Sequence, residues 1–213
     1  MKKKVEILIA DDHPIVRAGF KQVLADTPDM EVAAEAENGQ EVLNFLRKRD
    51  FDIILLDISM PGRNGLEVLK DIKSIKPRIP VLILSIYPEE QYAVRALRAG
   101  AAGYLTKASA PHELIAAIRK VTAGGKYIST ALAEKLTDYL STDLEKAPHE
   151  RLSDRELEVM LMIASGKTVS EIARELCLSV KTVSTYRSHI LEKMKLKNNA
   201  EITLYAVQNK LIG

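Results

Sequence analysis

The sequence has little cysteine and no long apolar run. A single cysteine, Cys177, excludes an intrachain disulfide framework and fits a reducing compartment, and we expect it to be a small buried residue of a short helix. No segment is long enough to span a bilayer. The apolar stretch after the basic start at 2–4 contains Glu6 and stops at Asp11, too early for a signal peptide. These absences predict a cytoplasmic protein with no membrane partner.

The chain as a whole also lacks a strong charge of either sign. Its formal net charge is +2, and its 46% hydrophobic and 28% charged residues are ordinary for a folded globular protein. Basic residues are dense only between 176 and 197, where Glu192 stands alone against Lys181, Arg187, Lys193, Lys195 and Lys197. Such a local excess suits binding to a polyanion.

Residues 5 to about 122 alternate short β-rich runs with segments of helical period. The expected strands lie near 5–10, 31–36, 52–57, 80–85 and 103–106, and the expected helices near 14–26, 39–49, 65–75, 89–99 and 111–123. Five successive βα units predict an α/β domain with a parallel sheet, right-handed crossovers and helices on both faces.

The pattern becomes purely helical after a polar segment. We expect a first domain over 1–122, a linker over 123–149 with one amphipathic helix (129–139), and a compact four-helix domain over 150–213. Ser153 and Glu156 fit a capping box at the start of the first of these helices, which should end near Gly166. The other three are expected near 169–176, 180–195 and 199–209.

Carboxylates end two of the expected strands. Asp11 and Asp12 follow the run 5–10, and Asp57 ends the run that begins at 53. If these strands are neighbours in a parallel sheet, the three side chains crowd at its carboxyl edge, where open α/β sheets bind ligands. Their repulsion favours a bound cation, and hard oxygen ligands suit Mg²⁺ together with a phosphate. Taken singly, each Asp is equally well explained as a strand end or a helix cap.

Two further strand ends carry groups that suit a phosphate. Ser85 closes the run 81–84 and offers a hydroxyl donor, and Lys107 follows the run 103–106 and offers an ammonium. Tyr104, one of few aromatic residues in the chain, lies on the same fifth strand, placed to move between buried and exposed positions. Each alone would be an ordinary strand or loop residue, so only their joint placement indicates a site.

Residues 5–122 resemble the receiver domain of two-component response regulators, which carries these groups in the same order: Asp11-Asp12, Asp57, Ser85, Tyr104 and Lys107. The resemblance implies a flavodoxin-like five-stranded sheet of order 2-1-3-4-5. It also implies roles for the site residues: Asp57 as phosphoacceptor, Asp12, Asp57 and the backbone carbonyl of Ser59 as Mg²⁺ ligands, Asp11 as support through water, Ser85 and Tyr104 as a switch pair, and Lys107 on the phosphate.

One position departs from the receiver pattern. Many receivers have a proline after the lysine, often with a cis peptide bond, whereas Ala108 follows Lys107 here. A cis bond before a residue other than proline costs about 2.5–4 kcal/mol, which favours a trans bond at this point.

The last domain contains two expected helices, 170–176 and 180–194, joined by 177–179 with the length of a helix-turn-helix. On the second helix Val183, Ile190 and Met194 form an apolar stripe that should pack inward, with Tyr186 and Arg187 at its edges. The opposite face carries side chains that suit base edges and phosphates: Lys181, Ser184, Thr185, Ser188 and Glu192. An ordinary solvated face is the alternative interpretation of this pattern.

Residues 152–159, with Glu171-Ile172-Ala173 and Lys181-Thr182-Val183-Ser184, resemble the LuxR-type helix-turn-helix, and a receiver joined to it is similar to the NarL/FixJ family. The resemblance implies duplex DNA as a partner, the helix 180–194 in the major groove, and homodimers on DNA formed partly by 199–208. The expected DNA contacts are Lys181, Thr182, Ser184, Thr185, Arg187, Ser188, Lys193, Lys195 and Lys197. The role of Arg187 stays open, because this place in the family is often apolar.

The sequence thus predicts a transcriptional regulator and not an enzyme. Its Asp57 would accept a phosphoryl group from a sensor histidine kinase or a small phosphodonor with Mg²⁺, and phosphorylation would favour homodimers. One alternative is a Mg²⁺-dependent phosphatase with Asp57 as nucleophile, although the neighbouring residues 58–60 offer no second general acid. Another is a module whose C-terminal helices bind protein or RNA. A pseudo-receiver is disfavoured because the acidic residues are all present.

Overall fold

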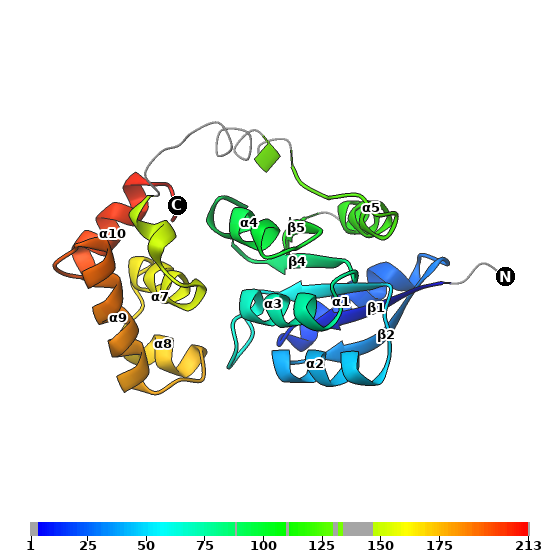
Figure 1. The fold of residues 1–213 in the computed structure, drawn as a ribbon, viewed down its shortest axis with the longest axis horizontal. Helices are drawn as coiled ribbons and strands as arrows, with labels where there is room; N and C mark the ends of the chain where they lie inside the picture. Colours follow the sequence, from blue (N-terminus) through cyan, green and yellow to red (C-terminus); the bar gives the residue numbers. More distant parts are fainter. Residues whose placement is uncertain (1–3, 88, 110, 130–131, 134–146, 213) are drawn as a thin grey trace. The chain divides into compact units, whose positions relative to one another are not determined.

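The computed structural model describes residues 4–87, 89–109, 111–129, 132–133 and 147–212 (Figure 1). The chain divides into two compact units, Met1–Tyr139 and Leu140–Gly213. The linker helix expected over 129–139 falls largely outside the described residues. No helix in the described ranges combines the length and the apolar composition needed to cross a membrane.

The first unit is a βα repeat in which strands and helices alternate without interruption. The elements are β1 (Val5–Ala10), α1 (Pro14–Ala25), β2 (Met30–Ala36), α2 (Gly39–Lys48), β3 (Ile53–Asp57), α3 (Gly65–Ile75), β4 (Val81–Ser85), α4 (Glu89–Arg98), β5 (Gly103–Thr106) and α5 (Pro111–Thr122). All neighbouring strands pair in parallel, in the order β2-β1-β3-β4-β5. The flavodoxin-like order predicted from the sequence is confirmed.

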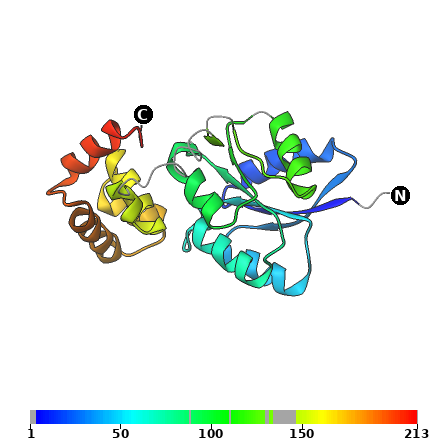
Figure 2. The ribbon, with the colours of Figure 1, turned by 45° about the horizontal axis from the view of Figure 1, so that its top comes forward.

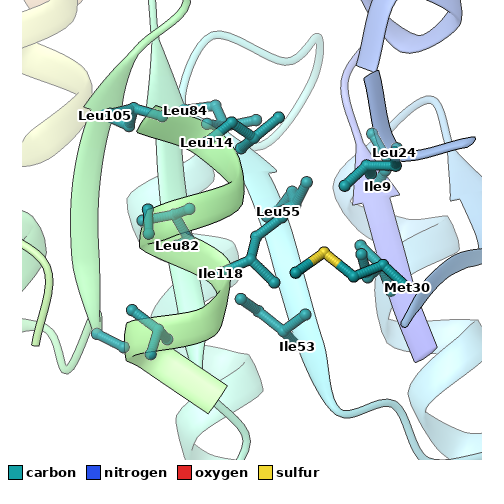
Figure 3. Packing of buried hydrophobic residues seen from close by; sticks show 14 residues of the cluster. Ile9, Leu24, Met30, Ile53, Leu55, Leu82, Leu84, Leu105, Leu114 and Ile118 are labelled. Carbon is teal, nitrogen blue, oxygen red and sulfur yellow. The ribbon is translucent and has the colours of Figure 1, made fainter. Parts of the chain in front are cut away.

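Helices α1 and α5 pack against one face of the sheet. Strand register places Ile9, Leu55 and Leu82 in one row across β1, β3 and β4, and Leu114 and Ile118 of α5 point toward these strands (Figure 3). Figures 1 and 2 show the sheet between α5 on one side and α2 and α3 on the other. Because both faces are covered, all five residues of β3 are buried.

The turn between β3 and α3 is packed tightly against the end of β3. Asn64 caps α3 by accepting a hydrogen bond from the backbone of Leu66. The N–H of Gly65 donates to the carbonyl of Ile58 at 2.9 Å. A Cβ atom on Gly65 would lie only 2.2 Å from the backbone oxygen of Asp57. A side chain at position 65 is therefore excluded by backbone atoms that follow the buried strand.

The chain stays attached to the sheet after α5. The N–H of Tyr127 donates to the carbonyl of Ala102 at 2.9 Å, and the N–H of Tyr104 donates to the carbonyl of Tyr127 at 3.3 Å. Gly103 lies opposite Tyr127 in this parallel bridge. Both the N–H and the carbonyl of Tyr127 are thus hydrogen-bonded to residues 102–104, at and next to β5.

The second unit contains a 3₁₀ turn (Pro148–Arg151) and the four expected helices: α7 (Asp154–Ala164), α8 (Val169–Glu175), α9 (Val180–Met194) and α10 (Asn199–Gln208). The capping box of Ser153 and Glu156 is present at the start of α7, as predicted. Helix α7 contacts the other three helices. The inward stripe of α9 is also confirmed, since Val183 and Ile190 are 0% exposed and Met194 is 6% exposed.

The expectation that Cys177 is buried within a helix is wrong. Helix α8 ends at Glu175, and Cys177 is exposed in the turn that follows, with a left-handed φ of 53°. The N–H of Leu178 donates to the carbonyl of Ala173 at 2.8 Å, which closes the turn in the manner of a Schellman motif. The buried apolar position is taken instead by the preceding residue, Leu176.

We predict that Gly65→Ala destabilises the first unit, by about 1–3 kcal/mol, because the added methyl overlaps backbone atoms next to Asp57. Gly19→Ala is the matched control: a Cβ there meets nothing within 4 Å, and the change should stabilise α1 by about 0.5–1 kcal/mol. Urea denaturation of both variants of the full chain checks this. Equal midpoints for Gly65→Ala and the native chain would contradict the close packing of this turn.

Candidate functional site

The carboxyl ends of β1 and β3 bring three carboxylates together. This acidic cluster consists of Asp11, Asp12 and Asp57; Asp11 and Asp57 are each 0% exposed, and Asp12 is half-buried. Lys107, which follows β5, places its Nζ 2.6 Å from Asp11 Oδ2 and 2.8 Å from Asp57 Oδ2. One ammonium therefore links the ends of three strands.

The charges of this group are strongly coupled. Burial raises the pKa of the Asp57 carboxyl above its ordinary value; the ion pair with Lys107 opposes this effect, and the nearby charge of Asp11 adds to it. For Lys107, burial acts to lower the pKa, but the attraction of Asp57 and Asp11 outweighs it and raises the pKa. The lysine therefore stays charged, and one ammonium faces three acidic groups. A further cation is electrostatically favoured here.

The acidic cluster offers the ligands that a hard divalent cation requires. Ligand atoms of Asp11, Asp12, His13 and Asp57 all lie within 4.8 Å of one another. The N–H of Ser59 donates to Asp57 Oδ1 at 3.1 Å and so fixes the orientation of that carboxylate. Carboxylate oxygens supplemented by water are typical Mg²⁺ ligands, so the donor set fits this ion.

His13 belongs to the same group and was missed by the sequence reasoning. Its Nδ1 lies 2.9 Å from Asp12 Oδ1 and 3.3 Å from Asp11 Oδ1. The signal was available, because His13 directly follows the two aspartates. The two aspartates were interpreted as the end of a strand, without His13. Helix α1 begins immediately after His13, and the imidazole ring lies against both carboxylates.

Arg17 of α1 holds the end of β1 in place and was also missed. The side chain is buried, with 7% of the residue exposed. Its Nη1 donates to the backbone oxygen of Asp11 at 2.7 Å, and its Nε and Nη2 donate to Glu35 and Glu37 at 3.3 and 2.5 Å. A planar guanidinium can serve three acceptors in this way. The sequence signal is an arginine at helical spacing from the apolar Leu24.

The predicted switch residues meet at one backbone segment. Ser85 Oγ accepts a hydrogen bond from the N–H of Tyr87 at 3.0 Å, and the Tyr104 hydroxyl donates to the carbonyl of Tyr87 at 2.9 Å. Tyr104 is 0% exposed, and burial raises the pKa of its phenol far above the ordinary value. Tyr104 was expected to move between a buried and an exposed position, and the structure has it in the buried one. Tyr87, which connects the pair, was not predicted.

The loop that carries Lys107 is fixed to the neighbouring strand. The N–H of Lys107 donates to the carbonyl of Ser85 at 2.7 Å. The peptide bond before Ala108 is trans, as the sequence favours. The ammonium of Lys107 therefore reaches both carboxylates from a loop without the cis bond that many receivers have.

The outer face of α9 is open, as the sequence predicts. Lys181, Ser184, Thr185 and Ser188 are all exposed. The hydroxyls of Thr185 and Ser188 donate to backbone carbonyls four residues earlier, at 3.0 and 3.1 Å, so their lone pairs remain available to a partner. Thr182 is different, because it is half-buried and its hydroxyl lies 2.8 Å from that of Ser179, the cap of α9.

Two of the expected DNA-contacting cations have partners within the second unit. Arg187 Nε donates to Asn199 Oδ1 at 2.6 Å and so connects α9 to α10. Lys193 Nζ lies 2.8 and 2.6 Å from the two carboxylate oxygens of Glu156. Burial acts to raise the pKa of Glu156, but Lys193 and the capping contacts outweigh it and lower the pKa. Lys195 and Lys197 are exposed.

Both units match known families. Residues 7–119 match the response regulator receiver domain, and residues 150–206 match the bacterial regulatory proteins of the luxR family. The response regulator GacA of Pseudomonas aeruginosa is 37% identical over 209 residues, covering 98% of each chain. The response regulator UvrY of Escherichia coli is 36% identical over 208 residues, covering 97% of this chain and 95% of UvrY.

Solved structures of RcsB from Salmonella share this architecture. One RcsB structure aligns with a TM-score of 0.70 at 28% identity, covering 97% of this chain and 98% of RcsB. RcsB bound to promoter rprA with the phosphomimetic BeF₃⁻ aligns with a TM-score of 0.65 at 29% identity, covering 95% of this chain and 98% of RcsB. The chain belongs to the NarL/FixJ family of two-component response regulators, transcription regulators that join a receiver to a LuxR-type DNA-binding domain.

Proposed function

We propose that phosphorylation of Asp57 switches the DNA binding of this regulator. The observation that carries the proposal is the setting of Asp57: a buried carboxylate at the end of the central strand, oriented by the amide of Ser59 and paired with the ammonium of Lys107. Members of this family are transcription factors and not classical enzymes. The chemistry proposed for Asp57 is therefore its own modification, and we place it in the cytoplasm, where the chain has access to DNA.

The phosphoryl donor is a phosphohistidine of a sensor histidine kinase or a small acyl phosphate. A carboxylate oxygen of Asp57 bonds to phosphorus while the bond from phosphorus to the donor atom breaks, and the leaving group keeps the electron pair. Asp12, Asp57 and the carbonyl of Ser59 hold Mg²⁺, with Asp11 as support through water. When bound, this ion neutralises charge on the phosphoryl oxygens.

Lys107 and Ser85 hold the product. The ammonium of Lys107, now shared between Asp57 and Asp11, moves onto a phosphoryl oxygen. The hydroxyl of Ser85 turns to donate to another oxygen. Ser85 Oγ also accepts from the N–H of Tyr87, and the Tyr104 hydroxyl donates to the carbonyl of Tyr87. A rearrangement at Ser85 therefore reaches Tyr104 through Tyr87. The phosphoryl group thus shifts the population between two arrangements of this segment.

The phosphorylated regulator binds duplex DNA as a homodimer, with the outer face of α9 in the major groove. Helix α10 presents two apolar side chains to solvent: Leu204 is 56% exposed and Val207 is 54% exposed. A pair of such residues on one short helix suits self-association. A solved structure of two RcsB dimers bound to two parallel DNAs, with a TM-score of 0.59 at 28% identity, supports DNA binding as a dimer for this chain.

Asp57→Asn is expected to abolish labelling by radioactive acetyl phosphate with Mg²⁺, because the amide nitrogen and oxygen cannot replace the carboxylate nucleophile. The substitution preserves side-chain size and leaves Lys107 paired with Asp11, so the circular dichroism spectrum should not change. Asp50→Asn is the matched control: it removes an exposed carboxylate that pairs with Lys76, and its labelling should equal that of the native chain. Undiminished label on Asp57→Asn would exclude Asp57 as the phosphoacceptor.

The outer face of α9 should read sequence, whereas the lysines beyond its end should supply charge. Changing Ser184, Thr185 and Ser188 to alanine should reduce the preference for the operator, because each well-made base contact contributes about 1–3 kcal/mol of discrimination. Lys195→Ala and Lys197→Ala should weaken binding to all DNA and reduce the salt slope by about one unit each. Competition binding at two salt concentrations measures both effects, on an operator first selected from genomic fragments.

A triple alanine variant that keeps the native operator preference would show that α9 is not the reading helix. Lys193 is left out of the comparison because its loss also removes the partner of Glu156, which is only 3% exposed. Lys48→Ala, an exposed lysine of the first unit, is the control and should leave both readouts unchanged.

Charge on the exposed face of α10 should prevent dimers. Leu204→Asp combined with Val207→Asp should abolish cooperative binding to an operator with two half-sites, since four like charges, two from each protomer, would be buried in the interface. Binding to a single half-site should persist, which controls for folding. Sedimentation of the native chain with BeF₃⁻ and Mg²⁺ should show the dimer. If the double variant sediments as the same dimer on DNA, α10 is not the interface.

A further inference from the structure

A second charged hollow lies at the edge of the first unit opposite the acidic cluster. It is surrounded by the amino ends of four strands, at Val5, Asp52, Pro80 and Ala102, and by the end of α5 with the turn that follows. Its volume is about 660 Å³. Small-ligand sites typically occupy roughly 300–1,000 Å³, so the hollow has the size of a binding site.

The charge of this hollow is unbalanced. Five basic residues line it: Lys4, Lys73, Arg78, Arg119 and Lys126. Two carboxylates, Asp29 and Asp52, also line it, so the basic residues are in excess by three. Asp29 accepts from Arg119 at 3.2 Å, and Asp52 accepts from the N–H of Glu6 at 2.9 Å. The chain as a whole has a net charge of only +2, so this edge is a local concentration of positive charge.

Lys73 and Lys126 both line this hollow, and each ammonium donates to a backbone carbonyl. Lys73 Nζ donates to the carbonyl of Ile79 at 2.5 Å, and Lys126 Nζ donates to the carbonyl of Ala101 at 2.6 Å. In the part of the chain that the structure describes, neither ammonium forms an ion pair. Burial lowers the pKa of Lys73, and the charge of Lys126 lowers it further. Each ammonium has three donors and uses one of them on a carbonyl.

Binding to backbone carbonyls alone does not account for this arrangement. A lysine that only caps a carbonyl gains nothing from a second lysine at its side, and repulsion between them costs stability. Arg78 adds a third cation on the same lining and is exposed. An anion that bridges the three side chains would remove the repulsion and use the free donors.

We propose that this hollow binds a small anion with two or more negative charges, of the diphosphate or polycarboxylate kind, between Lys73, Arg78 and Lys126. The site is distinct from the phosphorylation site, since the two lie at opposite ends of the same parallel strands. Anions are held by charge-assisted hydrogen bonds, which are about twice as strong as neutral ones. Binding of the anion does not require Asp57, and this site is not part of the function proposed above.

Isothermal titration calorimetry of the full chain with pyrophosphate, ATP and citrate, without Mg²⁺, tests this. Saturable binding that weakens with salt is expected. Tighter binding of pyrophosphate and ATP than of citrate assigns the site to phosphates, and the reverse order assigns it to carboxylates. Asp57→Asn should bind like the native chain. The absence of saturable binding of all three anions at millimolar concentration overturns the proposal.

Variants show whether the hollow is the binding site. Lys73→Met combined with Lys126→Gln should weaken binding by about tenfold or more, since neither new side chain can donate a charge-assisted hydrogen bond to the anion. Arg47→Gln combined with Lys48→Gln removes the same charge from α2, outside the lining, and should have no effect. Arg78→Gln changes an exposed residue, cannot disturb the core, and should also weaken binding. Native affinity in the Lys73/Lys126 variant, or an equal loss in the α2 control, excludes this site.

Discussion

The ion pairs of Lys107 with Asp11 and Asp57 are the interaction on which the receiver unit depends. Two buried carboxylates are costly to hold without a partner, and a single ammonium at 2.6 and 2.8 Å compensates both. The residues involved follow or end β1, β3 and β5, so a shift of any of these strands by one residue would turn a charge into the apolar core. The requirement that these buried charges stay paired therefore also fixes the register of the sheet.

The second unit depends on contacts that orient α9 from both ends. Ser179 caps its first turn, and Lys193 in its last turn pairs with Glu156, which also closes the capping box of α7. Arg187 reaches Asn199 at the start of α10. The outer face of α9 is thus exposed on a helix held by its neighbours, as a helix that reads a groove requires.

The sequence was sufficient for the fold and for the parts of the site that end strands. Short apolar runs and turn residues indicate β1 to β5, and strand ends share an edge in any parallel sheet, so Asp57 and Lys107 could be placed together. Arg17 and Tyr87 could not be found in this way, because neither ends a strand. The sequence signal for Arg17 is its helical spacing from Leu24, whereas Tyr87 acts through its own backbone, and such contacts leave no residue pattern.

Cys177 and Lys193 show a second limit of sequence reasoning. The small apolar side chain of Cys177 favoured a buried place in a helix, but the chain already turns at this residue and exposes it. Lys193 was expected to contact DNA, and its ion pair with Glu156, 37 residues earlier in the chain, was not predicted. In both cases the fold determines surroundings that a local pattern leaves open.

The parallel bridge between Tyr127 and β5 has a mechanical consequence. The N–H of Tyr104 donates to the carbonyl of Tyr127, so the residue whose ring forms half of the proposed switch also holds the chain that follows α5 against the sheet. In the proposed switch, a rearrangement at Tyr104 would therefore act on the backbone that follows α5, and a signal from Asp57 would reach that segment through the polypeptide itself.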